Sequence, residues 1–340
     1  MAGETGNGRA GAGWAPTFFV VAAAVCFGTT GTAQALGADS ASALSLGAAR
    51  IVFGGALLAI MAAAGLVWGH RRGAVARAYA PASAGWASLG LVAVGAVGAA
   101  AYQPTFFTGT SQNGVAVGTL VALGSAPVLT GLLDWGVRRR APGWRWAVST
   151  AVAALGVAAL TGVFGGGAGS AGAGAALAGG GGGASITPVG LLASLGAGLS
   201  YAVYALSSKA LLERGWSPTA TMGATFGAAA VIMLPVLLGS NLAWLGTARG
   251  ISTAVWLAVI TTGLAYTLFA RGLSQLPASR AATLTLVEPL TATVLGVLVL
   301  HEQFTAAIVA GLVLLVIGLA VLTSGWRRPR GTGAPPLSPR

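Results

Sequence analysis

The chain has 340 residues, of which 55% are hydrophobic and only 7% are charged, and its formal net charge is +12. A soluble domain carries about a quarter charged residues, so this composition excludes an ordinary soluble protein, and it is too apolar for a disordered one. A single cysteine, Cys26, excludes a disulfide scaffold. The composition therefore predicts a polytopic membrane protein.

Ten apolar segments follow one another along the chain, and each is long enough to cross a hydrocarbon core of about 30 Å as a helix. Their unbroken apolar runs lack the period-2 alternation of an outer-membrane barrel. We therefore predict an all-α membrane protein with ten transmembrane helices. The expected ranges are 15–36, 43–67, 84–107, 112–136, 145–164, 188–210, 218–239, 251–270, 278–300 and 304–324.

The basic residues fall between alternate spans rather than along one face. With the N-terminus in the cytoplasm, all of the 18 Lys and Arg residues except Arg50 and Arg249 lie on the cytoplasmic side. This is the positive-inside pattern, and it predicts a multi-pass protein of the cell (plasma) membrane with both termini cytoplasmic. The pattern makes the lipid bilayer the expected partner and argues against nucleic acid.

A Gly/Ala-rich stretch near the middle of the chain is typical of a flexible linker between two sets of five spans. The expected divisions are a cytoplasmic tail at 1–14, a first five-helix half at 15–164, the linker at 165–187, a second five-helix half at 188–325 and a basic cytoplasmic tail at 326–340. Residues 15–35 could alternatively be a cleaved secretory signal, but Glu4 offsets Arg9 in the region before them.

The two halves are weakly similar to each other. Aligning Ala126-Pro127 with Glu288-Pro289 also brings Phe107 onto Phe269. Because each half has an odd number of spans, the halves must cross the membrane in opposite orientations. We therefore predict two inverted five-helix repeats, which are typical of secondary transporters.

These features resemble the EamA-type members of the drug/metabolite transporter superfamily over residues 15–325. The resemblance is carried by the five-plus-five arrangement, by Arg50 near the start of the second span, by Glu288-Pro289 in the ninth, and by Leu300-His301-Glu302 at its end. Arg138-Arg139-Arg140 departs from the family, whose members often have an acidic residue there, and the long linker is also atypical. The resemblance implies a cavity lined by the first, third, fourth, sixth, eighth and ninth helices, and amino acids or related metabolites as substrates.

Glu288 is the first candidate substrate-binding residue. Its span begins near residue 278, which places Glu288 about 15 Å deep in the hydrocarbon core. A carboxylate at that depth costs about 2.5–3.5 kcal/mol unless it faces water or a partner. Glu288 could bind a cation or amine, or carry a coupling proton; alternatively, it could satisfy backbone groups freed by Pro289.

Arg50 is the second candidate, about 10 Å into its span from the outer side. Its guanidinium could bind a substrate carboxylate, snorkel outward or pair with an acid. Together with Glu288 it suits a zwitterion such as an amino acid, and the two residues equally suit a salt bridge.

Neutral polar side chains within the spans are the remaining candidates, because they could make a cavity polar. They are Tyr102, Gln103, Tyr204, Tyr266 and Thr30. Tyrosines also form interfacial belts, and a threonine hydroxyl often bonds to its own helix. Four prolines are expected to interrupt their helices, namely Pro104, Pro127, Pro235 and Pro289.

Two pairs of charged residues at helix ends are expected to be structural. Asp134 and Arg138 are four residues apart, as are Lys209 and Glu213, so each pair lies on one helical face.

The sequence thus predicts a secondary transporter that moves a small-molecule substrate, an amino acid or related compound, by alternating access, with export as the expected direction. We predict no enzyme activity, no cofactor and no metal, a monomer or homodimer, and protons as a candidate coupling ion. A passive facilitator and an accessory or structural subunit are the alternatives. An intramembrane enzyme is disfavoured because the chain has only six acids and two histidines.

Overall fold

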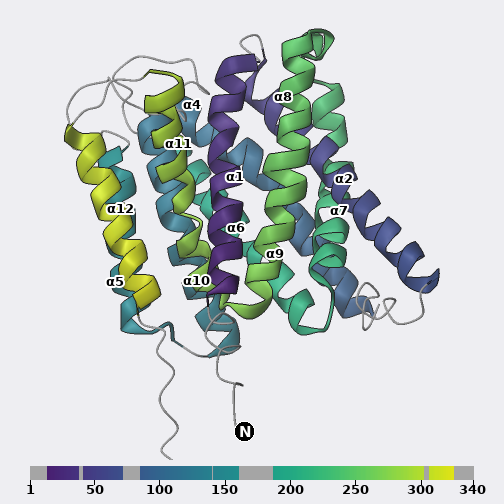
Figure 1. Ribbon diagram of the computed structural model, residues 1–340, viewed down its shortest axis with the longest axis horizontal. Helices are drawn as coiled ribbons and strands as arrows, with labels where there is room; N and C mark the ends of the chain where they lie inside the picture. The colour runs from purple at the N-terminus through teal and green to yellow at the C-terminus, as the bar shows by residue number, and fades with distance from the viewer. Residues whose placement is uncertain are drawn as a thin grey trace, which may run out of the picture.

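The computed structural model describes residues 14–37, 41–71, 85–139, 141–160, 187–301 and 306–324. Most of the predicted N-terminal tail and linker, and the whole of the predicted C-terminal tail, lie outside these residues. The described residues form a bundle of helices that run side by side between two ends (Figure 1).

The helices of the first half are α1 (Ala15–Gly37), α2 (Ala43–Arg71), α4 (Trp86–Arg138) and α5 (Trp144–Leu160). Those of the second half are α6 (Pro188–Glu213), α7 (Pro218–Leu238), η2 (Ala243–Gly246), α8 (Ala248–Ala258), η3 (Val259–Leu264), α9 (Ala265–Gln275), α10 (Ala278–Leu284), α11 (Val287–Val299) and α12 (Ala306–Ser324). Eight of the described helical segments are long and apolar enough to cross a membrane, and Trp144–Leu160 and Ile308–Ser324 are shorter apolar helices. The predicted all-α membrane architecture is confirmed, and each of the ten predicted segments is helical over most of its described residues.

Local sequence signals set where the helices of the second half begin. The Thr187 hydroxyl accepts a hydrogen bond from the amide of Gly190, with Pro188 at the first position of α6. Ser217 caps α7 in the same way, and Pro218 follows it. A hydroxyl cap satisfies a free amide, and proline at the first position lacks the amide that would need a partner.

The boundary predicted between the third and fourth spans is wrong. We expected a break at 108–111, but α4 runs on and turns at Gly114, where φ is 77° and ψ is 157°. Only glycine adopts this backbone conformation readily. The turn therefore occurs at Gly114 and not at Pro104 or Pro127. Pro104 and Pro127 lie inside α4, and Pro235 lies inside α7, without ending either helix. The prediction that these prolines interrupt their helices is therefore also wrong.

Two spans of the second half contain irregular backbone near their midpoints. The eighth span is formed by α8 and α9 with the π-helical turn η3 between them. The ninth span is divided into α10 and α11 at Thr285 and Leu286. Pro289 therefore lies in the first turn of α11, where a missing amide costs nothing.

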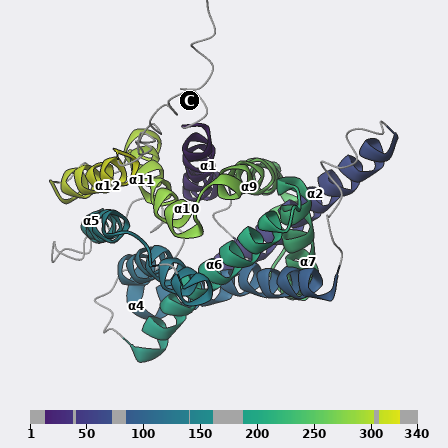
Figure 2. The same ribbon diagram turned by 90° about the horizontal axis from the view of Figure 1, so that it is seen from below.

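Helices of one half pack against helices of the other. α4 packs on α6, α2 on α7, α5 on α12, and α1 on both α9 and α11 (Figure 2). Glycines bring the backbones close: a Cβ atom on Gly223 of α7 would lie 2.7 Å from the carbonyl oxygen of Leu58 in α2. A Cβ atom on Gly156 of α5 would lie 2.7 Å from the amide nitrogen of Leu315 in α12. Such close packing is the main attraction available between helices in lipid.

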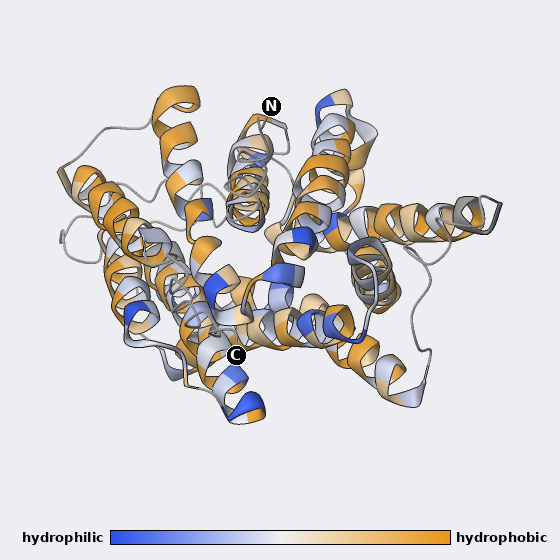
Figure 3. Ribbon diagram, turned by 60° about the horizontal axis from the view of Figure 1, so that its bottom comes forward, coloured by the Kyte–Doolittle hydropathy of each residue, from blue (hydrophilic) through white to orange (hydrophobic). Residues whose placement is uncertain are grey.

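Large apolar side chains point away from the bundle. Phe18, Val231 and Leu298 are among the most exposed of them, and hydrophobic residues predominate along the ribbon (Figure 3). A surface of this kind is stable in hydrocarbon and not in water. The chain is therefore a multi-pass membrane protein.

The two ends of the bundle differ in charge. One end joins α4 to α5, α6 to α7 and α9 to α10, and it contains Arg138, Lys209, Arg214 and Arg271. We call it the basic end. The opposite end contains the turn at Gly114, the start of α2 and the N-terminus of α8, where Arg249 lies.

We expect Gly156→Ala to destabilise the protein by about 1–3 kcal/mol, because the new methyl group meets the backbone of α12. Thermal unfolding in detergent measures the effect. Gly90→Ala in α4 is the matched control, because a Cβ atom there meets nothing within 4 Å. Equal stability of the two variants would contradict close packing of α5 on α12.

Candidate functional site

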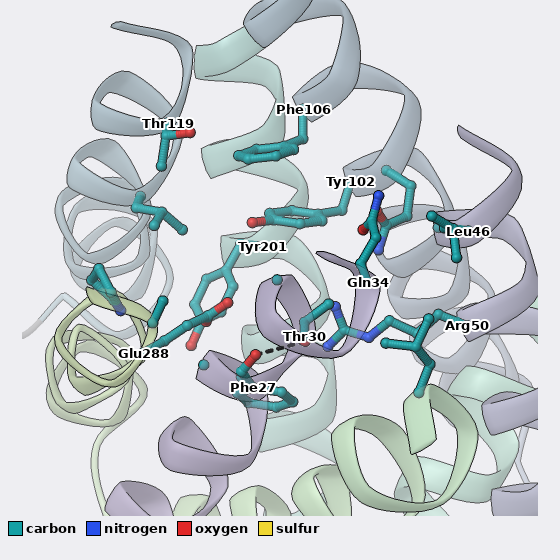
Figure 4. A pocket seen from close by; sticks show the side chains of 18 of the residues that line it. Phe27, Thr30, Gln34, Leu46, Arg50, Tyr102, Phe106, Thr119, Tyr201 and Glu288 are labelled. Atoms are coloured by element: carbon teal, nitrogen blue, oxygen red, sulfur yellow. Dashed lines mark hydrogen bonds between the residues drawn. The ribbon is translucent and has the colours of Figure 1, made fainter. Parts of the chain in front are cut away.

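A cavity of about 180 Å³ lies between the two halves of the protein. All seven predicted substrate-binding residues line it, although they come from six different helices. They are Thr30 of α1, Arg50 of α2, Tyr102 and Gln103 of α4, Tyr204 of α6, Tyr266 of α9 and Glu288 of α11. Figure 4 shows the labelled members of this set pointing into the same space. The structure thus brings together residues that are up to 258 positions apart in the sequence, between Thr30 and Glu288.

Glu288 is positioned by the break in the ninth span. It lies in the first turn of α11, and its amide donates to the Thr285 carbonyl at 2.8 Å. A helix N-terminus favours a negative charge, because its free amide groups and the positive end of the helix dipole lie there. Within the described residues, the Glu288 carboxyl makes no hydrogen bond or ion pair, and the side chain is half-buried at the cavity wall. Its oxygens are therefore free to meet a ligand or water.

Arg50 is held from the other half of the protein. Its Nη2 atom donates to the Thr261 carbonyl at 3.2 Å, and its guanidinium lies 5.7 Å from the centre of the Phe27 ring. Thr261 belongs to the π-helical turn η3, which displaces carbonyl oxygens from regular helix pairing. Gly54 of α2 lets this turn approach, because a Cβ atom there would overlap the Thr262 side chain. The Arg50 Nε atom is buried, and it has no hydrogen-bond partner among the described residues.

Arg50 and Glu288 do not pair with each other. Figure 4 places them on opposite sides of the cavity, with Tyr102 and Tyr201 between, and no ion pair joins them in the described structure. Of the two arrangements left open by the sequence, the salt bridge is therefore absent from this conformation. The cavity instead presents a cation on one wall and an acidic group on the other.

Aromatic rings form the floor of the cavity. The Tyr266 ring centre lies 4.9 Å from that of Phe27 and 4.0 Å from that of Phe226, and Tyr204 packs edge-on against Phe226 at 5.9 Å. Tyr204 and Tyr266 are 3% and 9% exposed, so only small parts of them reach the cavity. The Tyr201 hydroxyl is within hydrogen-bond distance of the Thr285 hydroxyl, at 3.2 Å. This contact joins the aromatic side chains of the cavity to the break between α10 and α11, just before Glu288.

The remaining predicted residues contribute unequally. Thr30 donates its hydroxyl to the Phe27 carbonyl at 2.6 Å, so the hydroxyl proton is used within its own helix (Figure 4). Gln103 is buried against α2, where Gly47 leaves room for its amide. Tyr102 stacks on Phe106 with ring centres 5.8 Å apart, above Tyr201 in the view of Figure 4.

Several lining residues were not predicted from the sequence. Gln34, Phe106 and Thr119 face the cavity in Figure 4, and Leu46 and Leu160 also line it. Gln34 did carry a signal, because it is a polar side chain in an apolar span. α2 and α5 also contribute to the wall, in addition to the helices implied by the resemblance.

The cavity extends from Glu288 towards the end of the bundle opposite the basic end. Gln34 is near the end of α1, Leu46 near the start of α2, Thr119 just past the turn at Gly114, and Leu160 at the end of α5. All of these positions belong to the same end of the bundle. The access side is therefore the side predicted to be extracytoplasmic.

A family model for the EamA-like transporter family matches residues 14–162 and 188–324, which is most of the chain. The chain belongs to the EamA-like transporter family. It is also 36% identical over 322 residues to the uncharacterized transporter YwfM of Bacillus subtilis (strain 168), and the match covers 95% of this chain and 98% of YwfM. The resemblance inferred from the sequence is thereby confirmed.

The fold of this EamA-like transporter also resembles that of a protein of known crystal structure. The TM-score is 0.69 at 19% identity, and the match covers 92% of this chain and 98% of the other. At this identity the likeness concerns the fold alone. Membership of the family and the multi-pass fold make the protein a membrane transporter.

We expect Glu288→Gln to change the free energy of unfolding by less than about 1 kcal/mol, since the residue has no ion-pair partner to lose. If Arg50 and Glu288 formed a buried pair, removing one charge would cost about 3–5 kcal/mol. Chemical or thermal unfolding of Glu288→Gln, Arg50→Gln and the double variant measures the coupling. Non-additive effects in that cycle would contradict the separation of the two residues.

Proposed function

We propose that this protein is a secondary transporter that moves an amino acid or a related small metabolite across the plasma membrane, with export as its direction. The observation that carries the proposal is the cavity between the two halves, whose walls hold Arg50 and Glu288 without pairing them. Charged groups at this depth are costly, and they are retained where they meet a substrate or ion.

The separation of the charges favours a zwitterion. A substrate carboxylate could replace the missing partner of the Arg50 guanidinium, which donates in a planar fork suited to carboxylates. A substrate ammonium could approach Glu288 at the opposite wall. The rings of Tyr102, Tyr201 and Tyr266 between them would contact the apolar part of the molecule.

We also propose that the two halves are inverted repeats, and the contacts between α2 and α7 support this. A Cβ atom added to Gly55 of α2 would overlap the carbonyl of Phe226 in α7, and one added to Gly223 of α7 would overlap the carbonyl of Leu58 in α2. The sequence shift that carries Gly55 onto Gly223 also carries Leu58 onto Phe226. Each contact is thus the counterpart of the other, as expected for an interface on a two-fold axis.

The contact of α5 with α12 has the same reciprocity. A Cβ atom on Gly156 would lie 2.9 Å from the Gly311 carbonyl oxygen, and one on Gly318 would lie 2.9 Å from that of Ser149. One shift carries Gly156 onto Gly318 and Ser149 onto Gly311, and it is the shift that aligns the fourth span with the ninth. Two halves related in this way can exchange conformations around a central site, which is the basis of alternating access.

The orientation that we propose places the basic end in the cytoplasm and both termini with it. The support is the positive-inside distribution, in which Arg249 is the exception at the opposite end. In this orientation, the cavity opens to the outside in the present conformation.

Protons are the coupling ion that we propose, with Glu288 as the exchanging group, because it is the one acidic side chain among the lining residues described. A passive facilitator would need no such group. An accessory subunit would need no cavity at Glu288, so the cavity weighs against that alternative.

The transport test uses purified protein in proteoliposomes with labelled amino acids, sugars, nucleosides and cationic drugs supplied separately. We expect gradient-dependent flux of the amino acids, and a loss of at least about ten-fold in Arg50→Gln and in Glu288→Gln, the equivalent of removing one charge-assisted contact. Thr323→Val is the matched control, because the Thr323 hydroxyl is bonded within α12 and the residue is not among those that line the cavity.

The outcomes separate the alternatives. Flux of one solute class that is independent of the gradient and retained in Glu288→Gln indicates a facilitator and contradicts proton coupling. Amino-acid flux retained in both charge variants contradicts the zwitterion site. Absence of flux for every solute favours the accessory-subunit alternative.

A further inference from the structure

Polar contacts join the two halves at the basic end, where the cavity does not reach. The first of them connects α4 of the first half to α6 of the second. Arg138 donates two hydrogen bonds to the Glu213 carboxylate, at 2.9 and 2.8 Å. Two parallel bonds between a guanidinium and a carboxylate fix distance and orientation together.

This contact merges the two pairs that the sequence predicted separately. Asp134 pairs with Arg138 within α4, and Lys209 lies 3.6 Å from Glu213 within α6, so both i,i+4 predictions are confirmed. The Arg138–Glu213 contact joins them into one network of four charges across the halves. We call these four residues the charge network.

Lys209 extends the charge network to a third helix. Its ammonium donates to the carbonyls of Leu273 at 2.8 Å and Ser274 at 3.3 Å, in the last turn of α9. Free carbonyls at a helix C-terminus attract a cation. The lysine side chain is 9% exposed, whereas Arg138 and Glu213 are 35% and 42% exposed. The network is therefore anchored inside the protein at Lys209 and open to water at Arg138 and Glu213.

A second set of contacts lies between the charge network and the cavity. The Trp146 indole of α5 donates to the Ser279 carbonyl of α10 at 3.2 Å, and the hydroxyls of Thr150 and Thr283 are 2.9 Å apart. Thr283 is five residues before Glu288 in the span that begins at the basic end, so these contacts lie nearer to that end than Glu288 does.

We infer that the charge network is the gate that closes the basic end of the cavity, with the Trp146–Ser279 and Thr150–Thr283 contacts as its inner layer. The inference rests on the proposed alternating access. The cavity is lined towards one end only, and every contact of the gate other than those of Lys209 and Asp134 joins one half to the other. Because Arg138 and Glu213 are partly exposed, water can replace each as a partner when they separate. The Arg138–Glu213 contact can therefore stabilise the conformation that is closed at the basic end and can still break when that end opens.

The test measures access to the cavity from each side and needs no substrate. In a Cys26→Ala background, Ala292→Cys on the cavity wall of α11 reports access to a membrane-impermeant methanethiosulfonate reagent. We expect Arg138→Gln and Glu213→Gln each to raise the labelling rate from the basic-end side about five-fold, the shift that corresponds to one lost ion pair. The double variant should add little, because both changes remove the same contact.

Arg139→Gln is the matched control, since Arg139 adjoins Arg138 but makes no ion pair within the described structure. An equal rise in Arg139→Gln, or no rise in Arg138→Gln and Glu213→Gln, overturns the gate. Absence of transport for every solute, with labelling that still rises in Arg138→Gln and Glu213→Gln, would instead contradict the proposed function, so the two failures are distinguishable.

A disulfide tests the inner layer. The hydroxyl oxygens of Thr150 and Thr283 lie 2.9 Å apart, so we choose these two positions for substitution by cysteine and oxidation to a disulfide. Oxidation of Thr150→Cys/Thr283→Cys should return labelling in Arg138→Gln to the rate of the intact gate, and dithiothreitol should reverse this. Thr150→Cys alone should show no such effect. Fast labelling from the basic-end side that persists in the oxidised pair contradicts closure at this layer.

Discussion

A backbone in hydrocarbon has no water to satisfy its polar groups, and this constraint governs the whole molecule. It explains why the described apolar segments are helices and why their outward faces are apolar. It also determines where irregular backbone can occur. The π-turn η3 and the break before α11 lie deep in the bundle, and each supplies a contact at the cavity: Thr261 bonds Arg50, and Thr285 meets Tyr201. Irregularity is thus tolerated where protein or a polar cavity replaces water.

The same constraint accounts for the polarity of the site. Arg50 obtains a carbonyl and an aromatic face from the protein, which satisfies part of its hydrogen-bonding capacity. Glu288 obtains a helix N-terminus but no side-chain partner among the described residues. Each group is half-buried at the cavity wall and still incompletely bonded. An incompletely bonded charge in an apolar interior has a large gain in free energy available on meeting a complementary group.

The interfaces between the halves are of two physical kinds. α2 with α7, and α5 with α12, meet through glycines whose backbones touch, and a contact of this type tolerates little separation. At the basic end, long charged side chains span the halves and remain partly exposed to water. Tight contacts in these two helix pairs and exchangeable contacts at one end would suit the alternating access that we propose for the two halves.

The sequence by itself determined the membrane class, the helical type of the spans and the family, and it predicted residues that line the cavity. Those features follow from local composition and from charges, since apolar length and basic loops act residue by residue. The turn at Gly114, with its positive φ, shows the limit, because the apolar pattern alone predicted the break at 108–111. Only the tertiary structure decided that Arg50 and Glu288 face each other unpaired, that Arg138 reaches Glu213, and that Gln34 and α2 join the wall. These facts depend on distances between helices far apart in the chain, and helix–helix packing sets those distances.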